Sequence, residues 1–154
     1  MKRMLPHVID IVREYGTNNP NELASALGIG VSYVDIDYFY HKYGMKAAFL
    51  KAGTVKTIII NRRFPVNERN VILAHELGHV FLHRGGYHWM EFHLLSKEKQ
   101  DRKELEANKF AFLLISHTCL RNRPSMIDGI RDEKVLTVED TTRLLEELSV
   151  CNCF

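Results

Sequence analysis

The order of hydrophobic and polar residues divides the chain into segments of helical period and segments rich in β-branched residues. Hydrophobic residues three or four positions apart predict amphipathic helices, whereas continuous or alternating β-branched residues predict strands. The predicted helices cover residues 5–15, 21–28, 68–83, 102–120 and 138–148, and the predicted strands or extended segments cover residues 31–40 and 55–61. Gly53 and Thr54 separate two β-prone runs and predict a hairpin. The sequence therefore predicts a small α+β fold.

The predicted helix over residues 68–83 carries polar residues that a helix made only to fill a core would not need. His75, Glu76, His79 and His83 stand within the run VILAHELGHVFLHRGG, residues 71–86. Residues four apart on a helix lie about 40° apart around its axis, so His75 and His79 can reach one ion. Neutral imidazoles at this spacing suit Zn²⁺. Glu76 points beside such an ion, where it can take a proton from the attacking water.

This H-E-x-x-H pattern has a plainer interpretation, in which two histidines of a core helix simply face solvent. Its place inside an amphipathic helix with a clear start and stop favours the metal site. A catalytic zinc also needs a third protein ligand and an open position. Leu82 and Gly85 stand where the metzincin pattern requires a glycine and a histidine, which excludes that pattern. A ligand at His83 would strain against the drift of the helix, so we interpret His83 as a packing or supporting residue.

The third ligand is expected from the next helix, where ELEANKFA offers Glu104 and Glu106. Glu104 shares a helix face with Asn108, whose side chain can hydrogen-bond the other nitrogen of a ligand histidine. Glu106 shares its face with Phe110, a core residue. The spacing therefore predicts Glu104 as the third ligand and Asn108 as a supporting residue.

Length, charge and composition narrow the class of protein. A chain of 154 residues suits one domain, or one domain with a small appendage, and can bury a substantial core. A formal charge of +2 is too small to favour nucleic acid or an anionic membrane as the main partner. No segment approaches the roughly 20 apolar residues that span a bilayer. Three cysteines, an odd count, are no disulfide framework, so a cytoplasmic location is expected.

Two segments resemble the first half of a helix-turn-helix unit. NELASALGI, residues 21–29, is followed by a β-prone run where a recognition helix would be required. LTVEDTTRLLEEL, residues 136–148, is capped by Thr137 and is followed by only six further residues. Direct binding of nucleic acid is therefore not expected.

The motifs TIIIN, AHELGH and ELEANKFA occur in that order. With these motifs the chain resembles the ImmA/IrrE family of metallo-endopeptidases, which are gluzincins. The resemblance covers about residues 1 to 115. It implies a small zincin-like domain over residues 1–118, with N-terminal helices, a short sheet whose edge strand precedes the HExxH helix, and a second zinc-ligand helix. Residues 119–154 would form a short helical C-terminal extension. By position, His75, His79 and Glu104 would bind Zn²⁺ and Glu76 would be the general base.

The resemblance also implies a function and a partner. The family's substrates are intracellular regulators, often a repressor of the phage or mobile-element type, whose cleavage derepresses its genes. The alternative is a protein that binds metal without proteolysis and acts on a repressor by binding alone. We expect an extended substrate to pair with the strand over residues 55–61, at Ile58, Ile59, Ile60 and Asn61. Tyr87, His88 and His93 are open candidates for stabilising the oxyanion.

Overall fold

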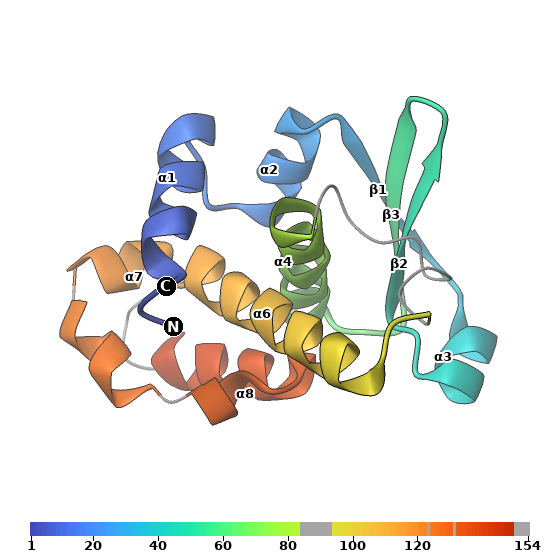
Figure 1. The fold of residues 1–154 in the computed structure, drawn as a ribbon. Coiled ribbons are helices and arrows are strands. Elements are labelled where there is room, and N and C mark those ends of the chain that lie inside the picture. Colours follow the sequence, from blue (N-terminus) through green and yellow to red (C-terminus); the bar gives the residue numbers. More distant parts are fainter. Residues whose placement is uncertain (84–93, 123, 131, 150–154) are drawn as a thin grey trace.

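The α+β prediction is confirmed by the computed structural model, which describes residues 1–83, 94–122, 124–130 and 132–149. In these residues a three-stranded sheet lies to one side of a group of helices (Figure 1). The helices are α1 (Leu5–Tyr15), α2 (Pro20–Ala26), α3 (Asp37–Tyr43), α4 (Val66–Leu82), α6 (Lys97–Ile115), α7 (His117–Asn122) and α8 (Val138–Ser149), with 3₁₀ turns η1 (Pro124–Gly129) and η2 (Asp132–Val135). The strands are β1 (Ile29–Val34), β2 (Ala47–Ala52) and β3 (Val55–Asn61).

The predicted position of the strand before the HExxH helix is wrong. β3 is the middle strand of the order β1-β3-β2, parallel to β1 and antiparallel to β2. Its residues Ile58, Ile59, Ile60 and Asn61 pair with Val31–Val34 on one side, and the first three pair with Ala47–Phe49 on the other. An added peptide strand needs an unpaired edge, so these residues are not open to it. The edge strands are β1 and β2.

Residues 37–43 form the helix α3, although their aromatic sequence predicts an extended segment. β1 ends at Val34, and α3 runs from Asp37 to Tyr43, where the left-handed backbone of Gly44 (φ 68°) ends the helix. The Asp37 carboxylate accepts a hydrogen bond from the buried Asn61 side chain at 2.8 Å. That contact with the end of β3, together with an ion pair to Arg63, holds the helix in place against the local β preference.

The HExxH helix α4 crosses α6 at close range, as Figure 1 shows. A Cβ atom placed on Gly78 would lie 3.1 Å from the Ala107 Cα atom and 3.2 Å from its carbonyl oxygen. Only glycine therefore allows the two backbones to approach this closely. α4 begins at Val66, two residues before the predicted start, because Pro65 is extended and leads directly into the first turn.

The C-terminal helix α8 shares the hydrophobic core with the rest of the chain. Thr137 accepts a hydrogen bond from the backbone N–H of Asp140 at 3.0 Å, which confirms the predicted cap. Leu144 and Leu145 are buried in the same cluster as residues of α4 and α6. The boundary at residue 118 stays a prediction, and this packing ties the two segments together. Among the described residues, none of the helices is both long and apolar enough to cross a membrane.

Candidate metal centre

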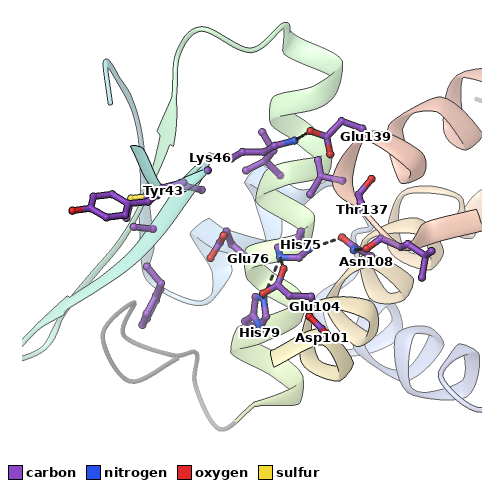
Figure 2. A pocket seen from close by; sticks show the side chains of 18 residues that line it. Tyr43, Lys46, His75, Glu76, His79, Asp101, Glu104, Asn108, Thr137 and Glu139 are labelled. Carbon is purple, nitrogen blue, oxygen red and sulfur yellow. Dashed lines mark hydrogen bonds and ion pairs between the residues drawn. The ribbon is translucent and has the colours of Figure 1, made fainter. Parts of the chain in front are cut away.

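Three side chains from two helices converge at the crossing of α4 and α6. His75 and His79 lie one turn apart on α4, both buried, and Glu104 comes from α6. The Nε2 atom of His75 lies 3.2 Å from Glu104 Oε2, and that of His79 lies 3.3 Å from Glu104 Oε1 (Figure 2). The structure therefore brings together the three predicted ligands, with their donor atoms facing one point.

The geometry of this group fits one small cation. The two Nε2 atoms are 3.1 Å apart, and one atom from each of the three side chains lies within 4.8 Å of the others. Nitrogens bound at about 2.0–2.1 Å to one tetrahedral zinc stand about 3.3 Å from each other. Two imidazoles and one carboxylate also form a common donor set of catalytic zinc sites. The side chains would need only a small adjustment to hold the ion.

His75 is oriented by Asn108. The Nδ1 atom of His75 lies 2.7 Å from the Asn108 Oδ1 atom, and the Asn108 amide donates to the Leu136 carbonyl oxygen at 2.7 Å. Because that carbonyl can only accept, the amide nitrogen faces Leu136 and the amide oxygen faces the histidine. His75 must then donate from Nδ1, which leaves Nε2, the atom that faces Glu104, as the nitrogen able to bind a cation. The supporting position predicted for Asn108 has the required contact.

His79 contacts a second pair of side chains. Its Nδ1 atom lies 2.9 Å from Nδ1 of His83, and Nε2 of His83 lies 3.0 Å from the Glu106 carboxylate. His83 is buried and lies outside the convergent group, as expected for a supporting residue. Glu106, the other candidate ligand, lies outside the convergent group and contacts His83.

Comparison with known proteins decides the family. The family described as IrrE N-terminal-like domain, Peptidase_M78, matches residues 24–147. The chain belongs to this Peptidase_M78 family. Its match continues past residue 118 and includes most of α8, in keeping with the shared core. The resemblance inferred from AHELGH and ELEANKFA is thereby confirmed.

A curated relative supports the same assignment. The chain is 33% identical over 109 residues to "Uncharacterized immunity region protein 2" of Bacillus phage phi105. The match covers 68% of this chain and 63% of the relative, so the chain spans less than two thirds of that protein's length. The search of solved structures returned no significant match.

The electrostatics of this Peptidase_M78 site favour a bound cation and a basic Glu76. Burial raises the pKa of Glu104, but hydrogen bonds with His75 and His79 outweigh it and hold that pKa far below its usual range. Burial lowers the pKa of His79 to about 4, which keeps its imidazole neutral, the form that binds metal. Burial raises the pKa of Glu76 to about 7. A carboxyl group with that pKa gains and loses a proton readily near neutral pH.

A cavity of about 470 Å³ opens in front of the three convergent side chains and Glu76. One wall is β2 with the turn before it, and the opposite walls are α4, α6 and the start of α8 (Figure 2). Lining residues that sequence reasoning missed include Tyr43, Lys46, Ala47, Phe49, Asp101, Leu136, Thr137, Val138 and Glu139. No motif marks them, because three separate segments supply them. The oxyanion candidates Tyr87, His88 and His93, like Cys151 and Cys153, lie outside the described residues.

Proposed function

We propose that this chain is a zinc-dependent endopeptidase, with His75, His79 and Glu104 as metal ligands. The observation that carries the proposal is the convergence of two Nε2 atoms and one carboxylate beside Glu76, at the base of an open cavity. Membership of the Peptidase_M78 family supports the same reaction. Glu104 is 42% exposed in its side chain, so the site is accessible from the cavity.

Glu76 is the proposed general base. When bound, zinc supplies a Lewis acid that polarises the peptide carbonyl and lowers the pKa of water. Glu76 lines the cavity directly beside His75, as Figure 2 shows. Its carboxylate takes a proton from the attacking water and later gives that proton to the leaving amine. The raised pKa of Glu76 suits both transfers.

The substrate docks along β2 in this proposal, in place of β3. The backbone N–H of Asn61 donates to the Lys46 carbonyl, which fixes Lys46 and every second residue after it as bonded to β3. Ala47 and Phe49 therefore direct their backbone N–H and C=O groups to the outer edge. Both residues line the cavity. An extended peptide can pair with these groups while its scissile bond reaches Glu76.

The proposed substrate is a repressor-type regulator. This part of the proposal rests on the resemblance to ImmA/IrrE peptidases, and a relative named for a phage immunity region is in keeping with it. A protein that binds metal without proteolysis and acts on a repressor by binding alone is the alternative. The two differ in whether the peptide bond is cut.

A pair of proteins, wild type and Glu76→Gln, tests the proposal. Each is loaded with zinc and incubated with a repressor encoded beside its gene and with a peptide library from a digested bacterial proteome. Mass spectrometry then counts new termini. We expect cleavage by the wild type and a loss of about 10²–10⁴-fold in Glu76→Gln at equal zinc content. Equal cleavage by both proteins would contradict the mechanism, and bound zinc without any cleavage would favour the alternative.

A further inference from the structure

We propose that His83 and Glu106 act together as a positioning pair that fixes the tautomer of the metal ligand His79. This inference rests on the metal-binding part of the proposed function. The pair is the chain of contacts His79 Nδ1 to His83 Nδ1 at 2.9 Å, and His83 Nε2 to Glu106 Oε2 at 3.0 Å. The proposed role of the pair is to orient Nε2 of His79 toward the metal, and neither member of the pair supplies a ligand atom itself.

The metal end of this chain dictates one direction of hydrogen bonding. Nε2 of His79 is the atom that faces Glu104 and His75, so zinc bound at this site would take the lone pair of that atom. A neutral imidazole with a free Nε2 lone pair carries its hydrogen on Nδ1. His79 therefore donates from Nδ1, and Nδ1 of His83 accepts. His83 must then carry its own hydrogen on Nε2.

The outer end of the chain requires the same direction independently. The Glu106 carboxylate can only accept, so the Nε2 atom facing it must bear hydrogen. A neutral His83 with hydrogen on Nε2 has an acceptor at Nδ1, which is the atom that His79 needs. Both ends therefore select a single arrangement, with hydrogens pointing outward from the metal. Partners of this kind hold ligand rings in place and typically change metal affinity 10- to 100-fold when removed.

The burial pattern suits a positioning role. The side chain of His83 is only 3% exposed, so water has little room to replace it as the acceptor from His79. Glu106 is 39% exposed and can be substituted with little effect on packing. His75 has an equivalent support in Asn108, which reaches the Leu136 carbonyl inside the protein. The support of His79 is the one that can be changed from the surface.

Substitutions at Glu106 test this direction. Glu106→Gln keeps an acceptor for His83, whereas Glu106→Lys offers only donors and favours the reversed chain, in which His79 carries hydrogen on Nε2. Glu98→Lys makes the same charge change on α6 at an exposed residue outside the cavity lining. Zinc affinity is measured for metal-free protein by competition with a chromogenic chelator, and circular dichroism checks folding.

We expect zinc binding about 10- to 100-fold weaker in Glu106→Lys, and within about threefold of wild type in Glu106→Gln and Glu98→Lys. His83→Phe, which fills the same space without a nitrogen, should match Glu106→Lys in affinity. Zinc binding by the wild type with equal affinity in the Lys and Gln variants would overturn the pair alone. Failure of the wild type to bind zinc would overturn the proposed function, and the pair with it.

Discussion

The α4–α6 crossing and the β2 edge form facing walls of one cavity, but they are built from different parts of the polypeptide. In the helical wall, side chains contact each other: each histidine is held by its own partner, Asn108 or His83. In the strand wall, the groups offered to the cavity are backbone N–H and C=O groups of Ala47 and Phe49. The chemistry of the helical wall therefore depends on which side chains are present, whereas that of the strand wall depends on the register of the sheet.

This difference predicts two separable kinds of damage. Changes in the helical wall should alter metal affinity or the stability of the crossing. Changes in the strand wall should alter the handling of peptide and leave metal binding intact. The substitutions that follow test this division.

Gly78→Leu should produce the largest effect, because it forces apart the two helices that carry all three ligands. A Cβ atom at this position already lies within 3.2 Å of Ala107 and Phe110 atoms. We expect a loss of about 3 kcal/mol in the free energy of unfolding, measured with urea on metal-free protein. Gly129→Leu is the control, since nothing lies within 4 Å of a Cβ atom there, and it should change stability by less than about 0.5 kcal/mol.

Asn108→Ala should weaken zinc binding about 10- to 100-fold, because His75 loses the acceptor that orients it. Asn108→Asp keeps an oxygen for His75 but cannot donate to the Leu136 carbonyl. It should therefore retain zinc while unfolding at a lower temperature. Chelator competition and thermal unfolding measure the two effects. Equal zinc affinity in Asn108→Ala and wild type would remove the role assigned to this side chain.

Ala47→Pro tests the strand wall. Proline removes an outward N–H without breaking a bond to β3, so the sheet should persist. We expect about a tenfold lower kcat/KM for a peptide found in the library, with unchanged zinc content. Lys51→Pro removes an equivalent outward N–H near the hairpin, beyond the cavity lining, and should leave kcat/KM within about twofold. Similar losses in both variants would mean that the edge acts through stability and that peptide pairing is not involved.

Glu139→Gln should have the smallest effect. Lys46 forms an ion pair with Glu139 of α8 and a second, 3.4 Å pair with Glu68 of α4, joining the strand wall to both helices. Burial raises the pKa of Glu139, but the hydrogen bond from Lys46 outweighs it and lowers the pKa below 4.5. A carboxyl group whose pKa is lower in the folded state stabilises the fold at pH values above its pKa in the unfolded chain. This stabilisation is lost as the pH falls through the pKa of the folded state.

The Glu139 side chain is 52% exposed, so solvent screens the pair. We expect a wild-type advantage of about 0.5 kcal/mol at pH 7 that fades below about pH 4.5. Urea unfolding of both proteins at pH 7 and pH 3.5 measures it. An advantage that grows toward pH 3.5 would contradict the sign derived from the pKa.

The helical wall could be predicted from the sequence because its geometry follows from local periodicity. His75 and His79 lie one turn apart on one helix, and Glu104 and Asn108 do so on another, so spacing alone places each pair on one face. The choice of Glu104 over Glu106 followed from the same rule. The partner of Asn108, the Leu136 carbonyl, could not be predicted, because it comes from a turn 28 positions further along the chain.

The strand wall was mispredicted because strand order is a property of distant segments. Nothing within TIIIN states that residues 29–34 and 47–52 pair on its two sides. The same limit explains α3, where DYFYHKY has strong β preference and yet forms a helix held by Asn61 and Arg63. Tertiary contacts decide the secondary structure of such short segments.

Zinc stoichiometry in three proteins tests the central claim most directly, namely that His75, His79 and Glu104 form a metal site. Wild type, Glu104→Ala and Glu106→Gln are loaded with zinc, dialysed and analysed by inductively coupled plasma mass spectrometry. The account predicts one zinc per chain in the wild type and in Glu106→Gln, and close to none in Glu104→Ala. Zinc retained by Glu104→Ala but lost from Glu106→Gln would contradict it.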